Sequence, residues 1–386
     1  MTSRRLLLLV GLFVLPGIAS ADPERFRVLK PIQKVQDRAT FLRQLHANGY
    51  RSKGGIDKSK TGDDDDRSKS FPHFNSSFTY QGVKYPFTMV GYQPKSGRTT
   101  SVRSAIIPLR MRFLYFEQDA VFEPGKAVRN IVKSPMYQDA RFANGVGQFG
   151  DQLQRATFWN KMDPGRQWHV RMASPRVLDT VEVIVEPDVG ELIQLGDTPD
   201  TIIGNVRFGF MDAIIHTILQ FVDVDPDELP IFVTYDVFAD ALGYHDAFAV
   251  GKGGGNDALQ TLIYTSWLEQ DLVGDLLADV STFNHELGEW LNDPYVNNIV
   301  PTWNYPNIDE CSFNPFLEVG DPQGNGPNFF TFPTVPIRLN GFTYHFQDLV
   351  MLPWFTGEVP SSAQNGWYDF PDTTQISAPF VPCAPN

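Results

Sequence analysis

Residues 283–294 read FNHELGEWLNDP and contain His285, Glu286 and Glu289 in the order H-E-x-x-E. Side chains four positions apart on a helix lie on one face, so His285 and Glu289 can bind one cation from a single rigid element. Glu286 is placed to deprotonate a water molecule beside that cation. The pattern differs from the zinc-binding motif H-E-x-x-H in its last residue. It therefore predicts a metal-dependent hydrolytic centre, and the alternative is an acidic surface helix that happens to contain a histidine.

The element that must position these groups is a predicted helix over residues 275–293. Pro294 ends it, because the residue before a proline is pushed out of the helical region. Its apolar residues fall on one side of a helical wheel: Val280, Phe283, Leu287 and Leu291. His285 and Glu289 fall on nearly the opposite side. A polar front of this kind suits either a metal centre or a solvated face, and Trp290 is assigned to core packing.

A third metal ligand must come from another segment. FLEVGDP supplies Glu318 and Asp321 in a stretch bounded by Gly and Pro that could turn back onto the helix. Asp309 and Glu310 are nearer in sequence, but they lie beside a cysteine and are the weaker candidates.

Two upstream histidines need separate interpretations. His245 in GYHDAF is expected on a loop after a strand, where it is a ligand, a group that contacts the substrate or transition state, or a loop histidine with no functional role. His216 lies in an apolar stretch that predicts a helix over residues 206–222, and a core position is expected for it.

The N-terminal segment indicates an exported protein. Residues 1–21 combine two arginines, a short apolar run and the small residues ASA, the layout of a secretory signal peptide. No second stretch is long and apolar enough to span a bilayer. The formal net charge of −13 argues against nucleic acid or an anionic membrane as partner. We therefore expect a secreted or periplasmic protein without a membrane span.

Two cysteines, Cys311 and Cys383, are expected to form one disulfide in an oxidising compartment. They are too few for a structural zinc cluster. The bond would tie the C-terminal tail to the region that follows the H-E-x-x-E helix.

Four regions follow from the patterning along the chain. After the signal peptide, residues 22–70 are polar and charge-rich, as in a linker or a pro-segment. Residues 71–195 hold short runs rich in aromatic and β-branched residues and are expected to be β-rich. Residues 196–386 add the predicted helices and a strand over 231–239. The sequence therefore predicts an α+β fold.

Several motifs together resemble a family of secreted, zincin-like proteins of bacteria and fungi that are regarded as metallopeptidases. HELGEWLNDP, a later tryptophan, LEVGDP, FQDLVMLPWF and NGWYDF carry the resemblance in the C-terminal half. LPIFVTYDVFA with GYH, SFTYQGVKYPFTMVG and QFGDQLQRATFWN carry it upstream. The similarity covers most of residues 71–370.

The resemblance implies a zincin-like catalytic core within residues 196–386 and a metal-dependent peptidase that acts on peptides or proteins. It implies His285 and Glu289 as metal ligands, Glu286 as general base and Glu318 as third ligand, with Asp321 orienting a ligand. Zinc is the expected ion, and the carboxylate-rich set leaves calcium or manganese possible.

Two other function classes compete with this interpretation. A secreted binding protein would use the same helix to hold a structural cation. A glycoside hydrolase would need paired carboxylates on opposing walls, whereas Glu286 and Glu289 lie on one helix.

Overall fold

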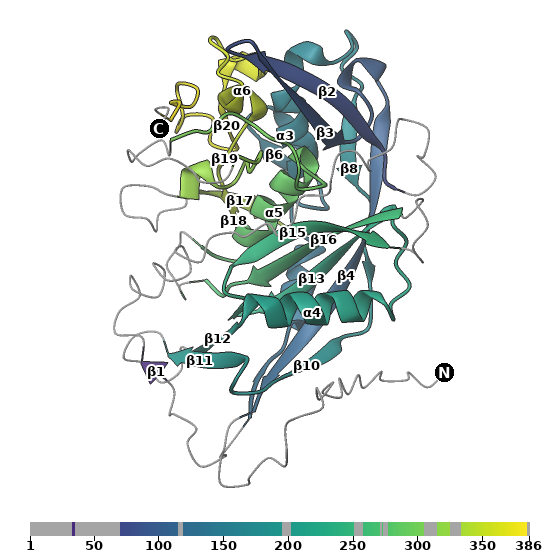
Figure 1. Ribbon diagram of the computed structural model, residues 1–386, viewed down its shortest axis with the longest axis vertical. Helices are drawn as coiled ribbons and strands as arrows, with labels where there is room; N and C mark the ends of the chain where they lie inside the picture. Colours follow the sequence, from purple (N-terminus) through teal and green to yellow (C-terminus); the bar gives the residue numbers. More distant parts are fainter. Residues whose placement is uncertain are drawn as a thin grey trace.

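The computed structural model of the 386-residue chain describes residues 33–34, 70–114, 119–194, 202–250, 258–270, 272, 277–304, 315–324 and 333–383. The predicted signal peptide and nearly all of segment 22–70 lie outside these residues. The described part is mixed α+β with sheets dominating (Figure 1), which confirms the predicted α+β class. Within it, no helix is long and apolar enough to cross a membrane.

The largest sheet positions the H-E-x-x-E helix and has the strand order β10-β4-β13-β16-β15. Its strands are β10 (Val181–Val185), β4 (Thr99–Phe113), β13 (Glu228–Tyr235), β16 (Ala258–Trp267) and β15 (Gly243–Val250). Neighbours along this path pair in parallel, except β15, which pairs antiparallel with β16. Three short strands also pair with β4: β5 (Ala120–Phe122), β8 (His169–Met172) and β9 (Arg176–Val177). The sheet therefore draws strands from both sides of residue 195.

The two faces of this sheet carry different helices. Successive residues of a strand point to opposite faces, so one strand contributes side chains to both apolar clusters. In β13, Ile231 and Val233 join the apolar cluster of α5 (Ser281–Asn292), whereas Phe232 joins the cluster of α4 (Phe208–Leu219). Figure 1 shows α4 lying across the strands, with α5 on their other side. The predicted helix over 206–222 is thus confirmed with slightly shorter bounds.

Helix α5 is shorter than predicted and is buried along its whole length. Asp279 has a φ of +44° and forms a β-bridge with Leu268, so residues 277–280 are not helical. The helix ends at Asn292, as Pro294 predicts. All twelve residues of α5 are buried. The alternative interpretation, an acidic helix with a solvated face, is therefore wrong.

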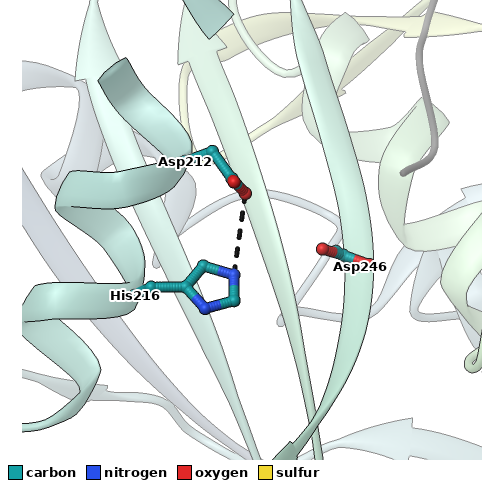
Figure 2. A group of neighbouring side chains, drawn as sticks. All are labelled: Asp212, His216 and Asp246. Atoms are coloured by element: carbon teal, nitrogen blue, oxygen red, sulfur yellow. Dashed lines mark ion pairs between the residues drawn. The ribbon is translucent and has the colours of Figure 1, made fainter. Parts of the chain in front are cut away.

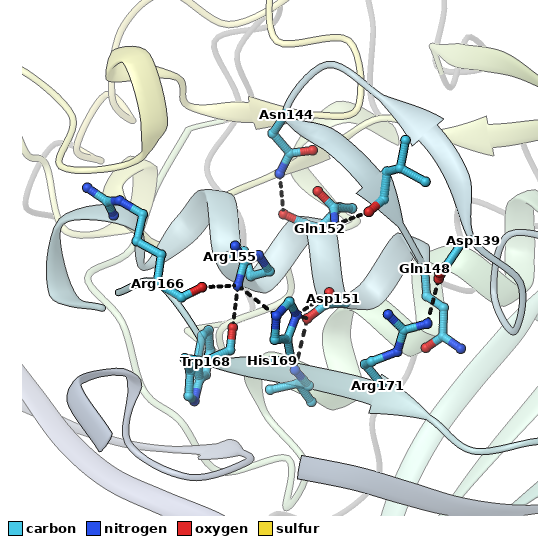
Figure 3. A network of polar contacts seen from close by, with 12 residues as sticks. Asp139, Asn144, Gln148, Asp151, Gln152, Arg155, Arg166, Trp168, His169 and Arg171 are labelled. Carbon is cyan, nitrogen blue, oxygen red and sulfur yellow. Dashed lines mark hydrogen bonds and ion pairs between the residues drawn. The ribbon is translucent and has the colours of Figure 1, made fainter. Parts of the chain in front are cut away.

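Helix α3 (Phe149–Thr157) supports α5 from the side and is tied to β8 by a polar network (Figure 3). The Asp151 carboxylate lies 2.9 Å from His169 Nδ1 and accepts a hydrogen bond from the Val170 amide. Gln148, just before the helix, exchanges hydrogen bonds with the backbone of Met172. Gly150 of α3 leaves room for Leu291 of α5, since a Cβ at this position would lie 2.8 Å from Leu291 Cδ1.

The remaining elements surround this core. A second sheet has the order β1-β11-β12-β14, from β1 (Gln33–Lys34), β11 (Gly190–Gln194), β12 (Ile202–Val206) and β14 (Val237–Phe238). Four two-stranded sheets pair β2 (His73–Tyr80) with β3 (Val83–Val90), β6 (Ala140–Phe142) with β7 (Gly145–Gly147), β17 (Thr334–Leu339) with β18 (Phe342–Gln347), and β19 (Leu349–Val350) with β20 (Asp369–Phe370). Short helices are α2 (Gly125–Ile131) and α6 (Leu352–Phe355), with 3-10 turns at Pro94–Ser96, Trp159–Lys161, Pro322–Gly324 and Gln364–Gly366.

The core contains the tryptophan predicted to pack there. Trp290 is fully buried and donates a hydrogen bond from Nε1 to Thr261 Oγ1 at 3.0 Å. Trp303 and Trp354 are also buried and lie edge to face. Cys383 is disulfide-bonded, and its predicted partner Cys311 lies outside the described residues.

Candidate metal centre

His285 is oriented by a side chain 62 residues further along the chain. Gln347 donates a hydrogen bond from Nε2 to the Gly320 carbonyl at 2.7 Å, so its amide oxygen faces the imidazole. His285 Nδ1 lies 2.9 Å from that oxygen and must be the donor. The Nε2 side of the ring consequently faces Glu289 Oε1 at 3.0 Å and Asp321 Oδ1 at 3.8 Å. An imidazole held this way by a second residue is the usual arrangement of a metal ligand.

Glu289 stands between two groups of potential ligand atoms. Its Oε1 faces His285 and accepts a hydrogen bond from the Gly320 amide at 3.1 Å. Its Oε2 lies 3.6 Å from His245 Nδ1. The structure thus contains two overlapping sets, each with ligand atoms within 4.8 Å of one another: His285, Glu289 and Asp321, and His245, Glu286 and Glu289.

Glu286 lies on the side of α5 that faces the sheet, and its carboxylate is directed at strand β15. Its Oε2 lies 3.5 Å from His245 Nδ1. A Cβ on Gly243 would lie 2.8 Å from Glu286 Oε1, so the glycine makes room for the carboxylate against the strand. Glu286 is fully buried, and neither of its oxygens receives a hydrogen bond from the described residues. A buried carboxylate in this state is costly unless a cation or a proton compensates it.

The segment 315–324 brings two further carboxylates to the helix. Its backbone is held by the amide of Leu317, which donates to the Asn298 carbonyl, and by the Val319 carbonyl, which accepts from the Val350 amide. Glu318 is buried, and neither of its oxygens accepts a hydrogen bond from an N–H or hydroxyl group of the described residues. Asp321 has a side chain that is 15% exposed, whereas those of His285 and Glu289 are 0% and 2% exposed. Solvent therefore approaches the cluster from the side of Asp321.

Burial dominates the electrostatics of the cluster. It raises the pKa of Glu286, Glu289 and Glu318 well above the usual range, and the neighbouring carboxylates raise these values further. Burial also raises the pKa of Asp321 to about 6, against the opposing effect of His285. Burial lowers the pKa of His245 to about 3 and also lowers that of His285, so both imidazoles are neutral near pH 7. Neutral imidazoles are the form that binds metals.

The chemistry of this set fits a divalent cation. Four carboxyl groups and two imidazoles converge, and no Lys or Arg forms an ion pair with any of the four carboxylates in the described part of the chain. A cation would compensate the negative charge that burial otherwise forces to be neutralised by protons. Two imidazoles favour a transition metal over calcium, which takes oxygen ligands.

The structure brings together all six residues that the sequence singled out, from three separate segments. One placement was wrong: His245 lies inside strand β15, not on a loop, because residues 243–250 pair with β16. Asp309 and Glu310, the weaker candidates, lie outside the described residues.

Sequence reasoning missed the residues that hold the cluster in place. Gln347, Gly320 and Gly243 have no local signal of their role, because each acts on a residue that is distant in the sequence. His216, expected in the core, has a side chain that is 35% exposed.

Comparison with known proteins assigns the chain to no family. No protein-family model, curated protein or solved structure matches the chain.

Proposed function

We propose that this protein is a metal-dependent hydrolase, with peptides or proteins as its substrates. The observation that carries the proposal is Glu286: a fully buried carboxylate without a hydrogen-bond donor, one residue from a metal-ligand candidate and beside a second imidazole. A purely structural acidic residue is expected to be neutralised by hydrogen bonds or a basic partner. The resemblance to zincin-like metallopeptidases is what favours peptide bonds as the target.

Each residue of the cluster has a role in the proposed hydrolysis. A bound divalent cation, zinc by preference, would polarise the carbonyl of the scissile bond. His285 and Glu289 would hold it, with Glu318 or Asp321 completing the set. Gln347 keeps the His285 proton on Nδ1, which leaves Nε2 as the nitrogen that would bind the ion.

Glu286 would act as the general base toward water. Its pKa is raised by burial, so its ionised form accepts a proton more readily than an exposed carboxylate does. The substrate would enter past Asp321, the most exposed side chain of the cluster. His245, neutral in its strand, is placed either to bind the ion with Glu289 or to donate a hydrogen bond to Glu286.

A second candidate function is a binding protein with a structural cation. The burial of all of α5 favours it, because a cation among His285, Glu289 and Asp321 would join α5 to the segment 315–324 without needing access for a substrate. The same ion would stabilise the fold and take no part in chemistry.

Metal analysis combined with peptide hydrolysis separates the two functions. For the hydrolase we expect about one tightly held metal per chain, lost in Glu289→Ala and retained in Glu286→Gln. Hydrolysis of a mixed peptide library should fall about 10²- to 10⁴-fold in Glu286→Gln. Glu191→Gln, an exposed glutamate in β11, is the matched control and should change neither quantity.

Retained metal without hydrolysis in the wild type would establish the structural role instead. Equal hydrolysis by wild type and Glu286→Gln would contradict Glu286 as the general base. Absence of any bound metal in the wild type would contradict both functions.

A further inference from the structure

A second group of metal-type side chains lies on the opposite face of β15 from His245. Asp212 and His216 come from α4, and Asp246 comes from β15. Each offers one ligand atom, and these atoms all lie within 4.8 Å of one another. Figure 2 shows Asp212 and His216 on one side of the helix, facing the strand that carries Asp246.

The sequence makes this grouping unusual for an apolar helix. In α4, FGFMDAIIHTIL, Asp212 and His216 are the titratable residues, and they lie four positions apart on one face. The opposing strand alternates, so Asp246 points toward α4 while its neighbour His245 points toward α5. One strand therefore supplies adjacent residues to two separate clusters.

The distances among Asp212, His216 and Asp246 suit three ligands around one ion better than a direct ion pair between Asp212 and His216. His216 Nε2 lies 3.6 Å from Asp212 Oδ1, which is longer than a hydrogen bond. The imidazole is held in place by Phe248, with ring centroids 4.3 Å apart. Asp246 Oδ1 accepts a hydrogen bond from the Ala247 amide at 2.7 Å, which orients that carboxylate.

A second, independent observation is the hydroxyl group of Tyr244. Tyr244 is 2% exposed, lies on the same face of β15 as Asp246, and its hydroxyl has no hydrogen-bond partner among the described residues. Burial raises the pKa of Tyr244 well above its usual value, and Asp212, Tyr264, Asp246 and Glu286 raise it further. A buried hydroxyl normally has a partner, and water on a bound ion would provide one.

We infer that Asp212, His216 and Asp246 form a second divalent cation site, separate from the centre on α5. One imidazole with two carboxylates suits zinc or manganese. The side chains of Asp212 and His216 are 25% and 35% exposed, so the ion keeps open positions for water and exchanges with solvent. Asp212 has no Lys or Arg partner among the described residues, which leaves its charge available to the ion.

The test is zinc stoichiometry of the full chain without an affinity tag, measured by equilibrium dialysis followed by elemental analysis. Wild type is compared with Asp212→Asn and His216→Gln, which change half-exposed positions and leave the α5 centre intact. Each should bind one zinc fewer than the wild type at a free zinc concentration that fills the wild-type site and lies below the weakened dissociation constant of the variants. Its affinity at this site should fall by more than the roughly 10- to 100-fold that loss of an outer partner causes.

Cobalt absorption provides an independent measurement. The wild type should show a visible band of the second site that disappears in His216→Gln and persists in Asp179→Asn, an exposed aspartate outside the group. Asp246→Asn should behave like the helix variants, and if it does not fold, those two variants decide.

Equal zinc content in the wild type and both helix variants would overturn the inference. So would a loss in His216→Gln but not in Asp212→Asn, because that outcome indicates a lone surface histidine.

Discussion

Gln347 decides which nitrogen of His285 can meet a cation. Its amide is locked by the Gly320 carbonyl, so His285 has to donate from Nδ1 and present Nε2 to Glu289. Gly320 itself lies against the imidazole and donates its amide to Glu289 Oε1. Two residues outside the H-E-x-x-E motif thus set the geometry of both ligand candidates within it.

Replacing Gly320 by alanine should disrupt this geometry. The added Cβ would lie 2.4–2.6 Å from atoms of the His285 ring, so the imidazole must move. We expect a loss of about 1–3 kcal/mol in the free energy of unfolding, together with weaker metal binding. Urea denaturation and metal analysis measure the two effects.

Gly209→Ala is the matched control, because a Cβ there meets nothing within 4 Å. In α4 this change should leave stability equal or raise it by up to about 1 kcal/mol. A Gly320→Ala protein with unchanged metal content and stability would show that His285 does not depend on this contact.

At the scale of elements, the C-terminal end of α5 is fixed by a set of side-chain hydrogen bonds. The Asp293 carboxylate accepts hydrogen bonds from the backbone amides of Asn297 and Asn298 at 2.9–3.1 Å. Asn298 in turn donates from Nδ2 to the carbonyls of Asn292 and Thr88, which joins the helix end to β3. These contacts hold the chain as it leaves the helix, and they require no metal.

Asp293→Ala should therefore destabilise the fold directly. It leaves buried amides without their acceptor, which costs on the order of 2–4 kcal/mol for two such groups. Chemical denaturation of the metal-free protein gives the value. Asp293→Asn keeps one acceptor oxygen and should lose less; equal losses in the two variants would show that hydrogen bonding at this position is not the cause.

The junction of β13 and β14 should make stability depend on pH. Burial raises the pKa of Asp236 to about 7, although its carboxylate accepts a hydrogen bond from the Glu269 amide. Because the folded state holds this proton more tightly than the unfolded chain, the stability it contributes is full below about pH 4 and is lost as the pH rises through 7.

Asp236→Asn should remove this loss. Its free energy of unfolding should exceed that of the wild type by about 1–3 kcal/mol at pH 8, and the difference should shrink toward pH 4. Asn also tolerates the φ of +52° at this position. Urea titrations at several pH values measure it, with the exposed Asp188→Asn as control. A difference that stays constant with pH would exclude Asp236 as its source.

At the scale of the whole molecule, the α5 centre joins segments that are far apart in the sequence. Ligand candidates come from β15, from α5 and from the segment 315–324. A cation bound there stabilises the folded state by an amount that grows with the logarithm of the ratio of its concentration to its dissociation constant, because the unfolded chain has no such site.

Removal of metal should therefore lower the unfolding temperature. For an ion present at about 1,000 times its dissociation constant the loss is about 4 kcal/mol, which corresponds to a shift on the order of 10 °C. Calorimetry with and without a chelator measures the shift, and added zinc should reverse it. Glu289→Ala should show a much smaller response, and an unchanged transition in chelated wild type would contradict the proposed centre.

Local patterns were sufficient to predict several elements. Aromatic and β-branched composition predicted that residues 71–195 are β-rich. Local patterns also predicted a strand over 231–239, which overlaps β13 and β14, and the helix α4, whose apolar residues recur three or four positions apart. The fold class was predicted for the same reason. The H-E-x-x-E spacing also placed His285 and Glu289 one turn apart, which follows from helix geometry alone.

The tertiary structure decided what surrounds those residues. A sequence cannot show whether the polar face of α5 meets water or protein, and here β15, β18 and the segment 315–324 bury it. His245, predicted on a loop, lies in a strand that pairs with β16, and there its imidazole is next to Glu286. Packing of α4 on β15 places His216 near Asp246. These arrangements depend on contacts between residues dozens of positions apart, and local spacing carries no information about such contacts.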